Sequence, residues 1–126
     1  MQTPDADEWR MASDVSTENR ARVLQVVRGI LGRMHDAGYV HGDVRAANVL
    51  VRIVATASAS GSTGAAGEMV SAMLIDFDEA GRVNEAHYSL LPFNPSVPFA
   101  PGVVPGGLIE ASHDLWRVES EDRFYA

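Results

Sequence analysis

The sequence contains no cysteine and no lysine. Without cysteine the chain can form neither a disulfide nor a thiolate metal site. All ten basic residues are therefore arginines, and they are scattered along a chain whose formal net charge is −7. This balance argues against a nucleic-acid partner, because phosphate backbones favour clustered basic side chains. No segment reaches the ~20 apolar residues that a membrane-spanning helix needs.

The N-terminal sequence MQTPDADEWRMASD is acidic and polar. It lacks the basic start and the apolar core of a signal peptide. We therefore expect a cytoplasmic or nuclear protein with no membrane partner and no nucleic-acid partner. A protein substrate or partner fits this composition, and the oligomeric state is left open.

The length of 126 residues suits one small domain. We assign residues 1–16 to a flexible lead-in and residues 17–126 to an α+β domain. An amphipathic helix is predicted from about Thr17 to the residue before Gly38, since glycine readily takes the left-handed conformation that ends a helix. Its apolar positions recur with helical period. They are Val23, Val27, Ile30, Leu31 and Met34.

Two apolar runs, 49–54 and 69–77, predict an antiparallel hairpin. The tract ATASASGSTGAAG at 55–67 lies between them and predicts a flexible insertion, because nothing in it can repay the entropy of ordering. Residues 88–107 contain five prolines and three glycines, which predicts an irregular segment. A short helix is expected to begin near Ser112.

The segment His41–Val51 reads HGDVRAANVLV, and the second apolar run ends in Leu74-Ile75-Asp76-Phe77-Asp78. An acid, an amide five residues later and a second acid after a strand are the components of a phosphoryl-transfer site. Asp43 can accept a hydroxyl proton, whereas Asn48 and Asp76 can hold magnesium on the phosphates of a nucleotide.

The order of helix, HGDVRAANVLV, strand and LIDFD resembles the C-terminal lobe of a protein-kinase-like phosphotransferase. The match covers roughly residues 17–118 and is closest to divergent fungal-type protein kinase-like proteins. The His-Gly-Asp form is similar to aminoglycoside and choline kinases, whereas Val-Arg-Ala-Ala-Asn is similar to Src-type tyrosine kinases. The implied fold is a partial C-lobe with an amphipathic helix, a catalytic loop, a hairpin with a long insertion, a Pro/Gly-rich segment and a short C-terminal helix.

The resemblance implies a role for each matching residue. Asp43 would be the catalytic base, and Arg45 would steady the γ-phosphate. Asn48 and Asp76 would bind metal, with Mg²⁺ and ATP as the implied cofactors. Asp114 would accept hydrogen bonds from the backbone of the catalytic loop. His41 would hold that loop through contacts with the backbone.

Two departures from the kinase pattern affect the functional prediction. Asp78 replaces the glycine of Asp-Phe-Gly, and the glycine cluster of Gly61, Gly64 and Gly67 follows the catalytic loop. The chain thus has neither a Gly-rich phosphate loop before that point nor a lysine for the α- and β-phosphates. We expect a truncated kinase-like phosphotransferase that is inactive in isolation. The alternatives are a non-catalytic pseudokinase-like binding module and a fragment of a small-molecule kinase.

Overall fold

The structure, a computed structural model, describes residues 8–56 and 67–126 of the chain. The fold is α+β, as the sequence predicts. Its strands are β1 (Arg10–Met11), β2 (Tyr39–Val40), β3 (Val49–Thr56), β4 (Gly67–Leu74) and β5 (Gly81–Arg82). Its α-helices are α1 (Arg20–Asp36), α2 (Ala111–Arg117) and α3 (Glu121–Phe124).

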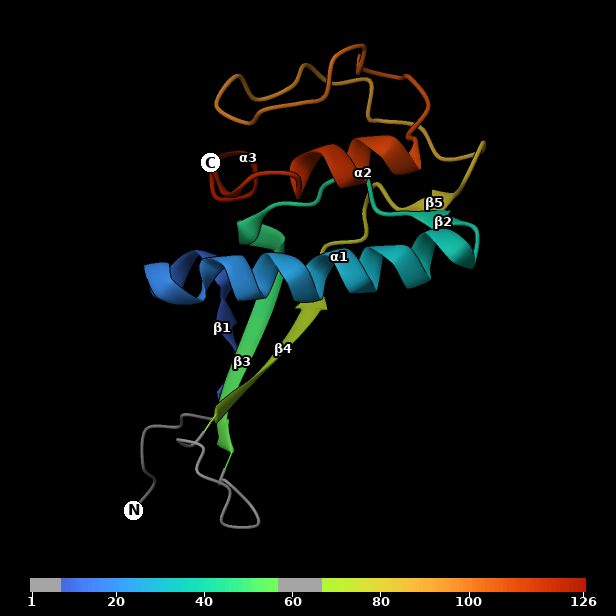
Figure 1. Cartoon of the computed structure of the whole chain (residues 1–126). Coiled ribbons are helices and arrows are strands. Elements are labelled where there is room, and N and C mark those ends of the chain that lie inside the picture. Colours follow the sequence, from blue (N-terminus) through green and yellow to red (C-terminus); the bar gives the residue numbers. More distant parts are fainter. Residues whose placement is uncertain (1–7, 57–66) are drawn as a thin grey trace.

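Helix α1 lies at the centre of the molecule, with a sheet on one side and the two C-terminal helices on the other (Figure 1). The sheet has the order β1-β3-β4 and is antiparallel throughout. A second, two-stranded sheet joins β2 to β5 near the C-terminal end of α1. The segment from His41 to Asn48 connects β2 to β3, so it runs from one sheet to the other.

The predicted helix is confirmed. A 3₁₀ turn over Thr17–Asn19 precedes α1. Of the predicted stripe, Val23, Val27 and Leu31 are buried, whereas Ile30 and Met34 are partly buried against the same core. Leu24 is buried as well. Gly38 ends the helix as expected. Its φ is +92°, and its N–H donates to the carbonyl of His35 at 2.9 Å.

The predicted hairpin is also confirmed, with β3 and β4 in register from Val49↔Leu74 to Thr56↔Gly67. The second strand ends at Leu74, three residues before the predicted end. Of the predicted insertion 55–67, residues 57–66 lie outside the described residues. The remaining three residues of that tract form the ends of the two strands.

The packed region extends further toward the N-terminus than the sequence predicts. Within the assigned lead-in 1–16, Arg10 and Met11 pair with Val51 and Leu50 of β3. Ala12 and Val15 are buried in the main core. A strand of two residues shows no periodicity in a sequence, so this pairing leaves no pattern from which it could be predicted.

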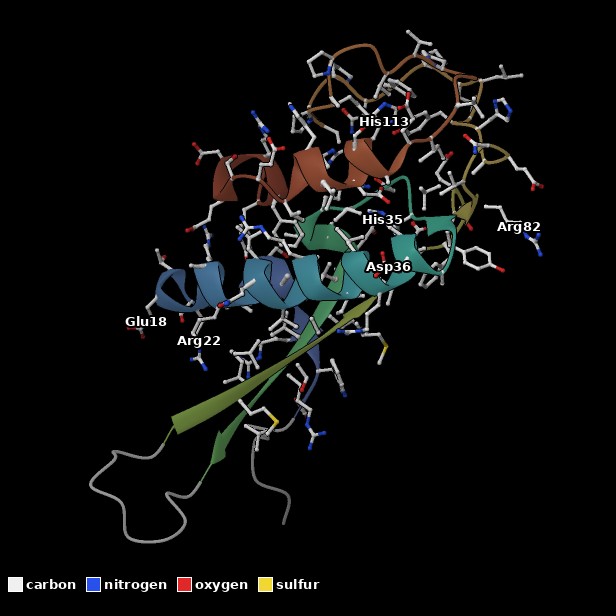
Figure 2. All side chains as sticks on the ribbon, turned by 45° about the vertical axis from the view of Figure 1, so that its right-hand side comes forward. Glu18, Arg22, His35, Asp36, Arg82 and His113 are labelled. Atoms are coloured by element: carbon white, nitrogen blue, oxygen red, sulfur yellow. The ribbon has the colours of Figure 1, made fainter. Side chains whose placement is uncertain are left out.

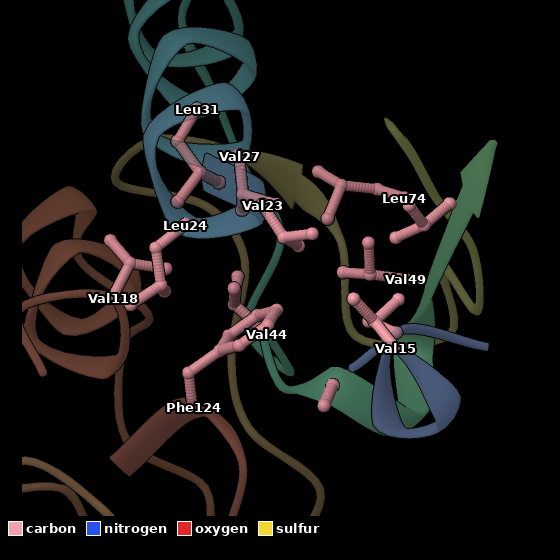
Figure 3. Close-up of a cluster of buried hydrophobic side chains, with 13 residues drawn as sticks. Val15, Val23, Leu24, Val27, Leu31, Val44, Val49, Leu74, Val118 and Phe124 are labelled. Carbon is pink, nitrogen blue, oxygen red and sulfur yellow. The ribbon is translucent and has the colours of Figure 1, made fainter. Parts of the chain in front are cut away.

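The main core joins α1, the hairpin and the C-terminal helices (Figure 3). Residues of α1 such as Leu31 pack between Leu74 of β4 and Val118, which follows α2. Phe124 of α3 is fully buried in the same cluster, although the sequence predicts no helix there. The chain end is therefore a structural part of the domain.

Residues 83–110 contain no helix or strand beyond one isolated bridge, which confirms the predicted irregular segment. A second small core lies beneath the segment and contains Val40, Tyr88 and Ile109. The rings of Phe93 and Phe99 stack at 4.2 Å beside it. Helix α2 then begins at Ala111, one residue before the predicted start.

A reciprocal capping box fixes this start of α2. The Glu110 side chain accepts from the His113 N–H, and the His113 side chain accepts from the Glu110 N–H.

Among the described residues, no helix combines the length and the apolar character that crossing a bilayer requires.

Replacing Phe124 by Ala tests the contribution of the chain end to the core. Removal of a fully buried ring should lower the free energy of unfolding by about 3–5 kcal/mol. Urea denaturation followed by circular dichroism measures this change. The matched control is Leu91→Ala, since Leu91 is 72% exposed and its removal should leave stability nearly unchanged. Equal stability of the two variants would contradict the packing of α3.

Candidate functional site

The side chain of Asp43 is the centre of a small hydrogen-bonded cluster in the loop between β2 and β3. The Asn48 Nδ2 group donates to the Asp43 carboxylate at 2.8 Å and to the Asp43 carbonyl at 2.9 Å. The Arg45 Nε donates to the other carboxylate oxygen at 3.0 Å. Three of the predicted site residues are thus in direct contact.

His41 connects this loop to the end of β4, as the sequence predicts for its structural role. The ring is fully buried. Its Nε2–H donates to the carbonyl of Ile75 at 2.9 Å, while its Nδ1 accepts from the N–H of Asp43 at 3.1 Å. These two bonds require the neutral tautomer with the proton on Nε2. The ring of Phe77 packs edge-on against it at 5.1 Å.

Asp76 is held next to the loop through its neighbour Ile75. The N–H of Ile75 donates to the carbonyl of Asn48 at 2.9 Å, which continues the register of β3 and β4 by one more pair. The backbone of Asp76 then turns into the left-handed region, with φ of 59°. Non-glycine residues rarely adopt this conformation, and it is concentrated at functional sites. The catalytic loop is therefore bonded to both backbone groups of Ile75, the residue before Asp76: Asn48 accepts from its N–H, and His41 donates to its carbonyl.

The donor set fits a hard divalent cation. Because the Asn48 amide nitrogen is directed at Asp43, the Asn48 Oδ1 is the atom that remains for a metal. The exposed Asp76 adds carboxylate oxygens, and oxygen ligands of this kind suit Mg²⁺. Within residues 8–56 and 67–126 no group of three or more His, Cys, Asp or Glu side chains is arranged to hold a metal. A cation here would thus need further oxygen ligands from phosphates or water.

Asp114 of α2 supports the loop from below, as the resemblance implies. Its carboxylate accepts from the N–H of His41 at 2.8 Å and from the N–H of Gly42 at 2.9 Å. His35 of α1 contacts the same carboxylate through Nε2 at 2.9 Å (Figure 2). Gly42 has φ of +87°, and a Cβ there would lie 2.8 Å from the Ile109 side chain. Only glycine fits that position.

Arg117 is a supporting residue that the sequence analysis did not identify. It lies three residues after Asp114, hence on the same face of α2, and it is 4% exposed. Its Nη1 donates to the carbonyl of Val44 at 3.2 Å. Burial lowers the pKa of its guanidinium, and the negative charge of Asp43 opposes that shift. Its position three residues after Asp114 could have predicted this role, because residues at this spacing share one face of a helix.

A pocket of about 200 Å³ opens beside Asp43. Its walls come from the catalytic loop and from the irregular segment, and they include Arg45, Tyr88, Phe93 and Phe99. Glu79 also lines it and accepts from the N–H of Ser89 at 3.1 Å, which ties the irregular segment to the chain just after Asp76. A group that entered this pocket would reach the carboxylate of Asp43.

A larger hollow of about 710 Å³ lies between α1 and β4. Its lining is apolar, with Ile30, Met34, Met73 and Phe77 among its residues. None of the predicted catalytic or metal-binding side chains lines it. Of the two pockets, the smaller one is therefore next to the candidate site, because Asp43 lines it.

Replacing Asp114 by Asn tests the support of the loop. Two charge-assisted bonds would weaken, and one amide hydrogen would face a backbone N–H, so stability should fall by about 2–4 kcal/mol. Hydrogen exchange at the amides of His41 and Gly42 should accelerate more than exchange in β3. The matched control, Asp122→Asn at an exposed position, should change neither quantity. Unchanged protection at His41 and Gly42 would contradict the assigned role of Asp114.

The comparisons with known proteins give one finding. The family model described as the lipopolysaccharide kinase (Kdo/WaaP) family matches residues 2–87, which include the whole catalytic loop and Asp76. No curated protein and no solved structure gives a significant match. The kinase-like resemblance is confirmed at the level of this family, and the fungal-type resemblance stays a prediction. The chain belongs to the lipopolysaccharide kinase (Kdo/WaaP) family, a kinase-like family.

Proposed function

We propose that this chain carries the acceptor-activating and metal-binding half of a kinase site, which transfers the γ-phosphoryl group of ATP to a hydroxyl. The observation that carries the proposal is the hydrogen-bonded cluster of Asp43, Arg45 and Asn48, bonded through Ile75 to the segment of Asp76. Family membership supports a kinase-like phosphotransferase. The roles of the individual residues are part of the proposal.

Asp43 would orient the acceptor hydroxyl and accept its proton. Its two carboxylate oxygens each take one hydrogen bond, from Arg45 and from Asn48, so the carboxylate is fixed before an acceptor arrives. Such preorganisation supplies much of the catalysis in phosphoryl transfer, where the protein mainly positions groups and stabilises charge. Arg45 adds a permanent positive charge for the transferred phosphoryl group.

Asn48 and Asp76 would hold magnesium, and the metal when bound neutralises charge on the nucleotide phosphates. Along the hairpin, the pair of Asn48 and Ile75 is followed by Val49 with Leu74 and then by Leu50 with Met73. They lie on the face of the sheet opposite to the buried pair Val49 and Leu74. An apolar surface two residue pairs along the hairpin from Asn48 and Ile75 suits the base of the nucleotide.

The pocket beside Asp43 would take the acceptor. Asp43, Arg45 and Glu79 offer hydrogen-bonding groups for hydroxyls, and the ring of Phe93 offers an apolar surface. The matching family is named for kinases of lipopolysaccharide. A hydroxyl on the saccharide part of an amphiphile is therefore the acceptor that we propose. The hydroxyl of a protein side chain is the second candidate, because Val44-Arg45-Ala46-Ala47-Asn48 is similar to the loop of tyrosine kinases.

These 126 residues supply no lysine and no Gly-rich loop ahead of Asp43 that could clamp the α- and β-phosphates. Loss of nucleotide positioning is costly in a site that works by positioning. We therefore propose that the chain by itself binds Mg-nucleotide weakly and has negligible kinase activity. A non-catalytic, pseudokinase-like binding module is the alternative function.

Magnesium and a non-hydrolysable ATP analogue should together raise the melting temperature of the protein. The cation is ligated by Asp76 and relieves the repulsion among the carboxylates of Asp43, Asp76 and Asp78. Asp76→Ala should abolish the rise. The matched control Asp78→Ala removes an exposed acid two residues away and should keep most of it. An unchanged wild-type melt, or equal loss in both variants, would refute the metal site.

ATP turnover by the purified chain should be indistinguishable from the background rate, with or without a saccharide acceptor. A coupled assay for ADP measures this, with Asp43→Ala as the reference for zero activity. Robust turnover that disappears in Asp43→Ala would show that the chain has a complete site, contrary to this expectation. It would also exclude the non-catalytic alternative.

A further inference from the structure

The segment from Tyr88 to Ile109 contains no aspartate, glutamate, lysine, arginine or histidine. Charged residues make up 21% of the chain, and all of them lie outside this segment. Surface segments of soluble domains normally intersperse charges of both signs. An uncharged stretch of this length on the surface therefore indicates an interaction with something that is itself uncharged or apolar.

The large hydrophobic side chains that this segment exposes are all aliphatic. Leu90 is 85% exposed, Leu91 72%, Val104 55% and Leu108 43%, and we call these four residues the apolar patch. A single exposed leucine is ordinary, but several from one uncharged segment are not. The aromatic rings of the same segment are directed inward instead, into the second core around Tyr88.

The patch is held in a defined shape. Residues 104–107 form a Val-Pro-Gly-Gly turn closed by the Gly107 N–H on the Val104 carbonyl at 3.0 Å, with Gly106 at φ of +77°. The Gly106 N–H donates to the Ser89 carbonyl at 3.0 Å, which fastens the turn beside the leucines. A Cβ on Gly106 would lie 2.7 Å from the side chain of Leu90, so this leucine lies directly over the turn.

The patch is continuous with the pocket that contains Asp43, because Leu91 lines that pocket as well. Acidic groups border it on the pocket side, where Glu79 bonds the Ser89 N–H, and Glu110 follows the segment. In Figure 1 the segment forms the loops at the top, on the far side of α2 from the three-stranded sheet. A flat surface could therefore approach it without meeting α1 or the hairpin.

We propose that the apolar patch docks the protein on a neutral lipid surface and thereby presents a membrane-held acceptor to Asp43. The purpose of the docking rests on the proposed function, whereas the docking itself requires neither nucleotide nor metal. Aliphatic side chains that enter the acyl boundary gain free energy in proportion to the apolar area they bury. The bordering acids and the net charge of −7 select against an anionic surface.

A protein partner fits the patch less well than a lipid surface. Protein interfaces derive most of their affinity from Trp, Tyr and Arg, whereas leucine and valine are under-represented at their centres. The patch exposes only leucine and valine. The composition alone led us to expect no membrane partner. The composition could not show that these aliphatic residues lie on the surface, because an uncharged apolar segment is just as often buried in a core.

The test is flotation of the full chain with phosphatidylcholine vesicles. The wild type should float with the vesicles, and Leu90→Ser/Leu91→Ser should bind at least about tenfold more weakly because two apolar side chains are lost. The matched control Met69→Ser/Leu115→Ser removes two exposed apolar side chains from β4 and α2. It should bind as the wild type does. Asp76→Ala should also bind normally, which separates this proposal from the metal site.

Four results would overturn the proposal. They are an absence of wild-type binding, an equal loss in both double variants, and binding that requires anionic lipid and disappears in high salt. The fourth is concentration-dependent self-association that Leu90→Ser/Leu91→Ser abolishes while vesicles do not bind, because a second copy would then cover the patch. If vesicle binding fails but magnesium still stabilises the protein with nucleotide, only the docking proposal falls.

Discussion

The site depends on the hydrogen bonds that the carboxylate of Asp114 accepts from the catalytic loop. This carboxylate is 1% exposed and accepts hydrogen bonds from the backbone of His41 and Gly42, with the His35 ring as a third partner. A buried carboxylate without such partners would be costly, so the three bonds explain how the charge is kept inside the domain. They also join α1, α2 and the catalytic loop at a single point. Arg117 on the same helix bonds the carbonyl of Val44 and fixes the loop further along.

This support determines the geometry of the reactive groups. Once His41 is fixed, its ring joins the loop to the carbonyl of Ile75, and the next residue is Asp76. Asn48 completes the connection through its own carbonyl and directs its amide toward Asp43. The side chains proposed for proton transfer and metal binding thus depend on backbone contacts that originate in α2. The irregular segment, tied to Glu79, then forms a wall of the pocket beside Asp43.

Much of this arrangement could be predicted because local patterns determine it. The helical stripe from Val23 to Met34, the glycine at 38 and the two apolar runs each specify an element without reference to the rest of the chain. The role of Asp114 was predicted from the resemblance to the C-terminal lobe of kinases. The pairing of Arg10 and Met11 with β3, and the burial of Phe124, depend on tertiary contacts between distant segments. Segments of two and four residues carry no periodic signal, so the sequence could not reveal them.

We propose that Asn48 and Asp76 hold one divalent ion beside Asp43. Manganese prefers the same oxygen ligands as magnesium and broadens the NMR signals of nearby nuclei. Titration of Mn²⁺ into the protein with an ATP analogue should broaden the signals of Gly42–Asn48 and of Ile75–Phe77 together, and Asp76→Ala should remove both effects. Broadening of only one of these segments, or persistence of both effects in Asp76→Ala, would contradict the account.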